Sequence, residues 1–381
     1  MTLSRRRNIP RAADTRKAAS GSFDWWLAII VLLLLCLGLL MVFSASGAVA
    51  ERMYSDKYHF FKRQCLFVLM GGVSAFIVAG LPRDLLYKLQ YPLLFAVFVL
   101  LVLTVSPLGL KIKGASRWIS FGVFSLQPLE FAKIALALYL AYFMSAKQEL
   151  VKTFSKGVLP PFLVTITLCA LLLMQPDFGG AVLLAAILLL MCWVGGTRFV
   201  YLFIAIGMGL ASVVALILHS PYRLRRLTAF LDPFKDAQDT GYQLVQSLYA
   251  LGSGGLFGSG LGGGVQKMLY LPEAHTDFIM SVIGEELGFL GLSVTLMLFS
   301  LLFVRCGKII MNQTDLRDKL SAFGITAVLS LGTLFNLAVV LGMAPPKGVA
   351  MPFLSYGGSS LLASMICVGL LLNFSRTARE L

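Results

Sequence analysis

The stretch from Trp25 to Phe43 reads WWLAIIVLLLLCLGLLMVF. These nineteen residues carry no charge, and an α-helix needs about 20 apolar residues to cross a bilayer. Basic residues precede the stretch and AVA follows it at Ala48 to Ala50, an arrangement that cleaved signal peptides also show. Because the apolar run is longer than the core of a usual signal peptide, we interpret it as an uncleaved first membrane span.

Apolar runs of the same kind recur along the chain. Of the 381 residues, 58% are hydrophobic and 13% are charged, which is typical of an integral membrane protein. We therefore predict an all-α polytopic membrane protein, a bundle of about ten transmembrane helices with one long extracytoplasmic loop. The predicted spans are residues 25–45, 63–80, 90–107, 128–145, 158–175, 179–196, 199–218, 278–304, 320–342 and 358–374.

The net charge of +14 has two possible explanations, nucleic-acid binding and membrane topology. The basic residues are scattered between spans and form no basic domain with interleaved aromatics, which argues against a nucleic-acid partner. Placing the Arg-rich start in the cytoplasm puts the excess of Lys and Arg on that side. We predict a cytoplasmic basic tail at 1–24, a ten-span membrane domain at 25–375 and a cytoplasmic tail at 376–381.

Two predicted outer loops are unusual. Residues 108–127 place Lys111, Lys113 and Arg117 among apolar and aromatic residues, a pattern typical of a segment lying in the membrane interface. The long loop at 219–276 begins basic, contains a predicted short helix at Tyr242 to Leu251 and then becomes glycine-rich from Gly252 to Gly264. The glycines indicate a hinge or a backbone lying against a ligand or lipid, with a low-complexity linker as the alternative.

Ionisable residues in or beside a span are costly and therefore candidates for function. Glu130 and Lys133 are three residues apart, so they share a helix face and can pair. Asp177 follows Pro176 at a predicted helix junction. For each of these charges the alternative is a structural ion pair that holds the bundle together.

The eighth predicted span begins with a further set of polar residues. Asp277, Ser281 and Glu285 are spaced four apart, which predicts one polar stripe running from the outer surface into the membrane. We expect Asp277 to lie at the outer mouth, and Glu285 and Glu286 to support the cavity. A transporter would have polar residues near the bilayer midplane in two repeated halves; here they gather near the outer ends of spans, which favours chemistry at the outer interface.

Several longer motifs together resemble one family. These are GASRWI (114–119), QPLEFAK (127–133), QPDFGGA (175–181), GYQLVQSLYALGSGGLFGSGLG (241–262), LPEAHTDFIMSVIGEELG (271–288) and PPKGVAMPFLSYGGSS (345–360). Across residues 25 to 375 the chain resembles the SEDS family of bacterial cell-wall proteins, and it is most similar to the cell-division branch. One departure is Leu129, where members of the family often have serine.

The resemblance implies a peptidoglycan glycosyltransferase that polymerises lipid II at the outer face of the bacterial inner membrane during septal wall synthesis. It implies Asp277 as the catalytic residue, and Arg117, Glu130, Lys133, Asp177 and Lys347 as residues of the substrate cavity. It also implies two kinds of partner, a class B penicillin-binding transpeptidase and other membrane proteins of the division complex. A divalent cation, Mg or Mn, is implied as well, although no ligand spacing in the sequence indicates one.

The implied reaction suits these residue types. A carboxylate at the outer mouth can act as general base for a sugar hydroxyl, and basic residues can hold the leaving pyrophosphate. The candidates for that second role are a metal or basic residues such as Arg117, Lys111, Lys113, Arg223, Arg225 and Arg226, and the sequence does not rank them. Two alternative functions are a lipid II flippase that uses Glu130, Lys133 and Asp177 as its pathway, and a scaffold at the division site.

Overall fold

The computed structural model describes residues 23–112, 115–120, 122, 124–239, 241–267 and 270–376. The predicted N-terminal tail up to residue 22, the C-terminal tail beyond Arg376, and Lys113 lie outside the described residues. Within the described residues, nine helices are long and apolar enough to cross a membrane, and the shorter apolar helix α6 makes a tenth. This confirms the predicted bundle of about ten spans.

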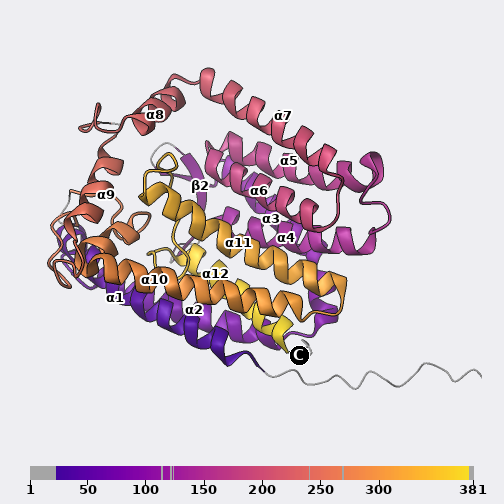
Figure 1. Cartoon of the computed structure of the whole chain (residues 1–381), viewed down its shortest axis with the longest axis horizontal. Coiled ribbons are helices and arrows are strands. Elements are labelled where there is room, and N and C mark those ends of the chain that lie inside the picture. Colours follow the sequence, from indigo (N-terminus) through magenta and orange to yellow (C-terminus); the bar gives the residue numbers. More distant parts are fainter. Residues whose placement is uncertain are drawn as a thin grey trace, which may run out of the picture.

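The bounds of these helices agree with the predicted runs to within several residues at most ends (Figure 1). They are α1 (Trp25–Tyr54), α2 (His59–Gly80), α3 (Arg83–Val105), α4 (Pro128–Ala146), the short π-helix η1 (Phe154–Val158) leading into α5 (Leu159–Met174), α6 (Phe178–Val194), α7 (Phe199–Leu218), α10 (Ile279–Met311), α11 (Leu316–Val340) and α12 (Gly358–Ser375).

Two of the connections carry structure of their own. The 108–127 loop contains a three-stranded antiparallel sheet in the order β1 (Gly109–Ile112), β2 (Ala115–Ser120), β3 (Ser125–Leu126). The predicted interfacial segment is therefore a small sheet, and it contains the strands found among the described residues. The long loop contains α8 (Pro221–Leu231) and α9 (Tyr242–Ser253), and α9 confirms the short helix predicted at Tyr242 to Leu251.

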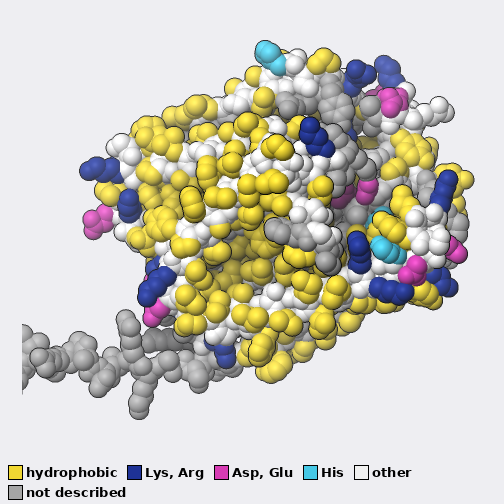
Figure 2. Space-filling model, turned by 180° about the vertical axis from the view of Figure 1, so that it is seen from behind, with side chains coloured by type: hydrophobic (Ala, Val, Ile, Leu, Met, Phe, Trp, Pro, Cys, Tyr) yellow, Lys and Arg dark blue, Asp and Glu magenta, His cyan; other side chains and the backbone are white. Residues whose placement is uncertain are grey.

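The helices differ in how much of their surface they bury. Most residues of α4 and α12 are buried, so these two helices form the centre of the bundle, whereas α7 buries only Leu202 and lies along one edge (Figure 1). Hydrophobic side chains cover the flank of the molecule, and charged side chains gather towards its two ends (Figure 2). This distribution is the one expected of a bundle surrounded by lipid.

Ion pairs and hydrogen bonds identify one end of the bundle, here called the Asp24 end. Arg305 of α10 donates to Asp24 at the start of α1 (2.8 Å), and Gln313 donates to the carbonyl of Phe374 at the end of α12 (3.0 Å). The start of α1 and the end of α12 therefore lie on the same side. At 1.5 Å per residue, Ser44 of α1 is about 30 Å from Asp24.

The connection between α11 and α12 enters the bundle, and we call residues 344–357 the re-entrant segment. A Cβ on Gly38, in the middle of α1, would lie 2.4 Å from the carbonyl oxygen of Phe353. Gln64 of α2 donates to the carbonyl of Ser355 (3.1 Å). Residues Met351 to Ser355 are all buried. Irregular backbone at this depth is stable because protein, not lipid, surrounds it.

The predicted span at 278–304 is not one continuous helix, because α10 is broken at Gly288. Gly288 has φ 64° and ψ −161°, a conformation that interrupts a helix and that glycine tolerates. The part of α10 before the break, residues 279–287, is here called the half-helix. Asp277 precedes it and lies in a turn, so the predicted helical stripe of Asp277, Ser281 and Glu285 is wrong in its first member.

Candidate functional site

Asp277 lies where the half-helix meets the re-entrant segment. The side-chain amide of Asn336, on α11, donates to the backbone carbonyls of both Asp277 and Val349 (2.7 Å each). A Cβ on Gly348 would lie 3.2 Å from Oδ2 of Asp277, so glycine at this position leaves room for the carboxylate. Asn336 is twenty residues after Leu316, which places Asp277 about 30 Å from the Asp24 end. We call this the Asp277 end.

Three other predicted residues gather around the start of α6. Asp177 caps this helix by accepting a hydrogen bond from the backbone N–H of Gly180 (3.1 Å). Nε of Arg117, on β2, is 3.9 Å from Oδ2 of Asp177, and Nζ of Lys347 lies 4.2 Å from the centre of the Phe178 ring.

We call Arg117, Lys347 and the start of α6 the positive cluster. Lys347 and Gly348 are neighbours in the re-entrant segment, so the positive cluster adjoins the position of Asp277. The start of a helix carries a partial positive charge, and together with Arg117 and Lys347 it outweighs the single negative charge of Asp177. Arrangements of this kind suit an anionic group such as a phosphate.

Glu130 and Lys133 form the ion pair that their spacing predicted. Nζ of Lys133 is 2.9 Å from Oε2 of Glu130, and both side chains are nearly buried. They line a cavity with Ala350 and Pro352 of the re-entrant segment and with residues of α11 and α12. The same segment therefore contributes to this cavity and to the surroundings of Asp277.

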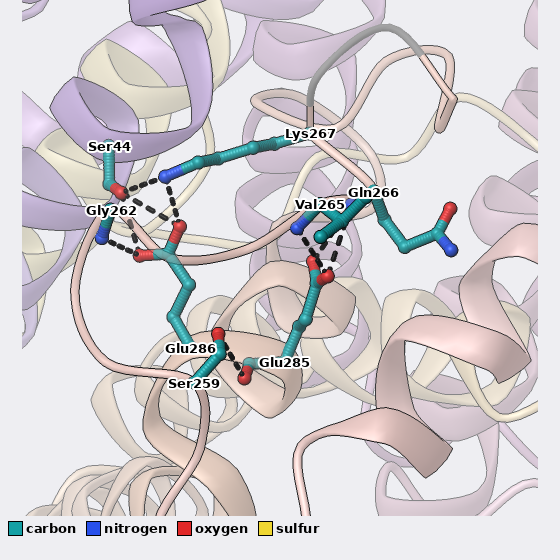
Figure 3. A network of polar contacts seen from close by, with 8 residues as sticks. All are labelled: Ser44, Ser259, Gly262, Val265, Gln266, Lys267, Glu285 and Glu286. Carbon is teal, nitrogen blue, oxygen red and sulfur yellow. Dashed lines mark hydrogen bonds and ion pairs between the residues drawn. The ribbon is translucent and has the colours of Figure 1, made fainter.

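Glu286 has a different set of partners, at the end of the half-helix (Figure 3). Its fully buried carboxylate pairs with Lys267 (2.5 Å) and accepts a hydrogen bond from Ser44 of α1 (2.6 Å). Glu285 accepts hydrogen bonds from the backbone N–H groups of Val265 (2.6 Å) and Gln266 (3.0 Å). These contacts join α10 to α1 and to the long loop.

Sequence reasoning missed Lys267, Ser44 and Asn336. Lysine is rarely buried without a partner, and the partner of Lys267 becomes visible only in the folded chain. For Asn336 a signal was available, because an amide in an otherwise apolar span needs partners for its polar atoms.

The described residues contain no group of three or more His, Cys, Asp or Glu side chains placed to hold a metal ion. Magnesium in enzymes of phosphorylated substrates is commonly held by one or two carboxylates together with the substrate's phosphates. Asp277 or Asp177 fits that more modest requirement, so the donor set is compatible with a cation that arrives with a pyrophosphate.

Known proteins resemble this chain over nearly its whole length. A probable peptidoglycan glycosyltransferase FtsW from Trichlorobacter lovleyi is 46% identical over 93% of each chain. The stage V sporulation protein E of Bacillus subtilis is 40% identical over 93% of this chain and 98% of its own.

Solved structures agree with these relatives. A chain from a structure described as "Structural coordination of polymerization and crosslinking by a peptidoglycan synthase complex" matches with a TM-score of 0.76 and 29% identity, over 93% of this chain and 98% of the other. The rod shape determining protein RodA of Thermus thermophilus matches with a TM-score of 0.71 and 29% identity, over 94% and 98% of the two chains.

The family model for FtsW, RodA and SpoVE, described as "Cell cycle protein", matches residues 24–380. This match confirms the resemblance that the motifs indicated. The chain belongs to the FtsW, RodA and SpoVE family, the SEDS family of multi-pass membrane proteins.

Proposed function

We propose that this chain polymerises lipid II, with Asp277 as the general base that deprotonates the acceptor sugar hydroxyl. The chain is a peptidoglycan glycosyltransferase of the FtsW type. The observation that carries the assignment to Asp277 is its position, because its carboxylate adjoins Gly348 while the neighbouring Lys347 lies in the positive cluster at the start of α6.

The reaction needs both parts of this site. The acceptor hydroxyl oxygen forms a bond to the anomeric carbon of a second lipid-linked sugar as the bond from that carbon to pyrophosphate breaks. The hydroxyl proton passes to the Asp277 carboxylate, and the pyrophosphate leaves with the bonding electron pair. Arg117, Lys347 and the start of α6 stabilise the charge on the leaving group.

A divalent cation, Mg or Mn, remains a proposal for this site. Bound with the pyrophosphate, it would supply further positive charge for the leaving group. Asp277 and Asp177 are the carboxylates that this part of the chain offers to it.

We place the Asp277 end outside the cell, with both termini in the cytoplasm. The Arg-rich segment before Trp25 precedes the Asp24 end directly, and positive charges flanking the first span favour the cytoplasmic side. The protein is a multi-pass protein of the bacterial inner membrane. A septal position is supported by its similarity to proteins named FtsW.

Contacts at the Asp24 end argue against the flippase alternative. Arg83 of α3 pairs with Asp318 of α11 and also donates to the carbonyl of Asn373 in α12 (3.0 Å). A translocation path would have to open this end to admit a large headgroup, which would break these buried contacts. The scaffold alternative gives no reason for charges gathered around the re-entrant segment.

A class B penicillin-binding transpeptidase is the partner that we propose, together with other membrane proteins of the division complex. The matched structure described as coordinating polymerization and crosslinking supports this, since one chain of such a complex has the same fold. Lipid II is the proposed substrate, because the description of that matched structure concerns polymerization by a peptidoglycan synthase.

The test is polymerisation of purified lipid II by the full-length chain copurified with its transpeptidase. We expect Asp277→Asn to abolish glycan polymer while leaving the melting temperature unchanged. Asp56→Asn serves as the control, because Asp56 is a partly exposed carboxylate on the α1–α2 loop that pairs with exposed Lys62 and accepts from the N–H of Tyr58. Normal polymer from the Asp277 variant would overturn the assignment, and labelled lipid II crossing vesicles without polymer would favour the flippase.

A further inference from the structure

The break in α10 is closed by backbone from the long loop. In a continuous helix the N–H groups of Phe289 and Leu290 would bond to the carbonyls of Glu285 and Glu286. Here Phe289 and Leu290 donate to the carbonyls of Gly255 (2.9 Å) and Leu256 (3.1 Å) instead.

The two carbonyls released by the break are also satisfied. Glu285 accepts from the N–H of Ser259 (2.9 Å) and Glu286 accepts from the N–H of Gly260 (3.0 Å). The loop thus replaces both missing helical bonds on both sides of the break. Glu285, Glu286 and Gly288 are buried, so these groups depend on protein partners.

The glycines of this loop allow its backbone to come close enough. Gly258 has φ +78°, and a Cβ there would lie 2.1 Å from the carbonyl oxygen of Glu286. A Cβ on Gly254 would lie 1.9 Å from the carbonyl oxygen of Gly284. The glycine-rich stretch is therefore not a low-complexity linker, but backbone packed against another backbone.

Charged side chains fasten the same loop a few residues later (Figure 3). Lys267 donates to Glu286 and to Ser44 (2.9 Å), and Gly262 donates its N–H to Oε2 of Glu286 (3.2 Å). The side chains of Lys267 and Glu286 are 7% and 0% exposed. Removing one charge of such a pair leaves the other buried and uncompensated.

We infer that Lys267 and Glu286 are positioning residues for the glycosyl transfer. Together with the loop from Gly254 to Lys267 they form a clamp on the break in α10, and the clamp sets the position of the half-helix and hence of Asp277. This inference rests on the proposed function of Asp277 for its catalytic consequence. The clamp itself is defined by contacts that do not include Asp277.

The half-helix is short enough to transmit a displacement. Its nine residues, 279–287, span about 13 Å. Asp277 lies two residues before its first turn and Glu286 lies in its last. Along its length, Ser281 bonds to Ser247 of α9 (2.7 Å), which also donates to the carbonyl of Val340 in α11 (3.0 Å). Releasing the clamp lets the Glu286 end of the half-helix move. Because the half-helix is short, Asp277 at its other end moves as well.

The kinetic test uses the full-length chain with its transpeptidase partner and purified lipid II. We expect Lys267→Met to lower kcat at least about tenfold while KM stays within about twofold. The matched control is Arg305→Met, which removes the ion pair that links α10 to the start of α1 at the Asp24 end. Its kcat should be unchanged, and an equal loss in both variants would overturn the inference.

A second variant guards against misfolding of the first. Lys267→Met/Glu286→Gln leaves no unpaired charge, and glutamine can still accept from Ser44 and Gly262. We expect this double variant to recover kcat to within about threefold of the wild type. No recovery in a folded double variant would show that the unpaired Glu286 charge does not cause the loss in Lys267→Met, and would overturn this account of the clamp.

Hydrogen–deuterium exchange separates this inference from the proposed function. Lys267→Met should raise exchange at the Ser259, Gly260, Phe289 and Leu290 amides, whatever Asp277 does. Raised exchange with normal kcat, or unchanged exchange with lowered kcat, would overturn positioning through the clamp. Normal polymerisation by Asp277→Asn would instead overturn the proposed base, leaving the exchange result to judge the clamp alone.

Discussion

Helices α1 and α10 are joined by charged groups at both ends, and the two junctions differ. At the Asp24 end, Arg305 donates to Asp24 with its side chain 28% exposed, and the helical backbone around it is continuous. At the Asp277 end, Lys267 and Glu286 are buried, Ser44 contributes a hydroxyl, and the backbone of α10 is broken two residues after Glu286.

The difference shows that the Arg305–Asp24 pair stabilises the bundle, whereas the Lys267–Glu286 pair also fixes the position of the half-helix. Where the backbone of both helices is continuous, as at the Asp24 end, an ion pair adds to bundle stability and little else. Each helix there keeps its own hydrogen bonds. At the broken end, polar contacts supplied by a loop replace those bonds. A change there should alter the position of the half-helix as well as the stability.

The largest effect should come from Gly258→Ala. The new Cβ would meet the Glu286 carbonyl, which would force the loop away and break the hydrogen bonds to Ser259 and Gly260, at a cost of roughly 2–6 kcal/mol. We expect a lower melting temperature in detergent and no measurable glycan polymer from lipid II.

The matched control is Gly260→Ala in the same loop. Gly260 also has a positive φ, +86°, but a Cβ there would meet nothing within 4 Å. The expected cost is therefore only the conformational penalty of about 1–2 kcal/mol. Equal effects of the two variants would show that loop conformation, and not contact with α10, explains the loss.

The spans were predictable because apolar length is a property of the local sequence, and the Glu130 and Lys133 pair was predictable because three residues along a helix is a local distance. The break at Gly288 was not, since a glycine within a span does not by itself break a helix, and Gly307 lies in the continuous part of α10. Its stability depends on Gly255, Leu256 and other backbone about thirty residues earlier.

The candidate site shows the same limit. Asp277 was identified from its motif, and Asp177 from the helix junction, but their neighbours come from distant segments. Arg117 and Asp177 are sixty residues apart in sequence, and Lys347 reaches α6 only because the re-entrant segment enters the bundle. Lys267 was missed because a lysine within a loop is normally solvated.

The next largest loss of stability is expected for Lys267→Met, which should be more destabilising than Arg305→Met. Lys267→Met leaves the Glu286 carboxylate unpaired in a buried site, which typically costs about 3–5 kcal/mol. Arg305→Met removes a partly exposed pair, for which about 1 kcal/mol is expected. Thermal unfolding of both variants in the same detergent measures the difference, and similar melting temperatures would contradict it.

Two buried asparagine side chains allow the Asp277 end and the Asp24 end to be compared without changing a charge. Asn336 bridges the carbonyls of Asp277 and Val349 at the Asp277 end, and Asn373 donates to those of Ala79 and Leu81 at the Asp24 end. Replacing either by leucine leaves carbonyls without a donor, at about 1–3 kcal/mol for each.

The two leucine variants should differ in activity although they lose comparable stability. We expect Asn336→Leu to lower kcat about tenfold, because the backbone of Asp277 loses its link to the re-entrant segment. Asn373→Leu should leave the kcat of the folded fraction unchanged. A fall in kcat with Asn373→Leu of the same size would mean that activity follows overall stability and not the placement of Asp277.

The smallest effect should come from Asp56→Asn, which tests whether an ion pair matters because of where it lies or because it is buried. Asp56, on the α1–α2 loop, pairs at 2.9 Å with Lys62 of α2, and both side chains are more than a third exposed. The hydrogen bond from Lys62 lowers the pKa of Asp56, so any contribution to stability is present above the ordinary carboxyl pKa and is lost as pH falls through the lowered one.

Solvent screens a pair as exposed as Asp56 and Lys62. We therefore expect no measurable change in melting temperature between pH 5 and pH 8 and none in polymerisation. A loss of activity like that of Lys267→Met would mean that charge on the α1–α2 loop, and not burial at the break in α10, controls the site.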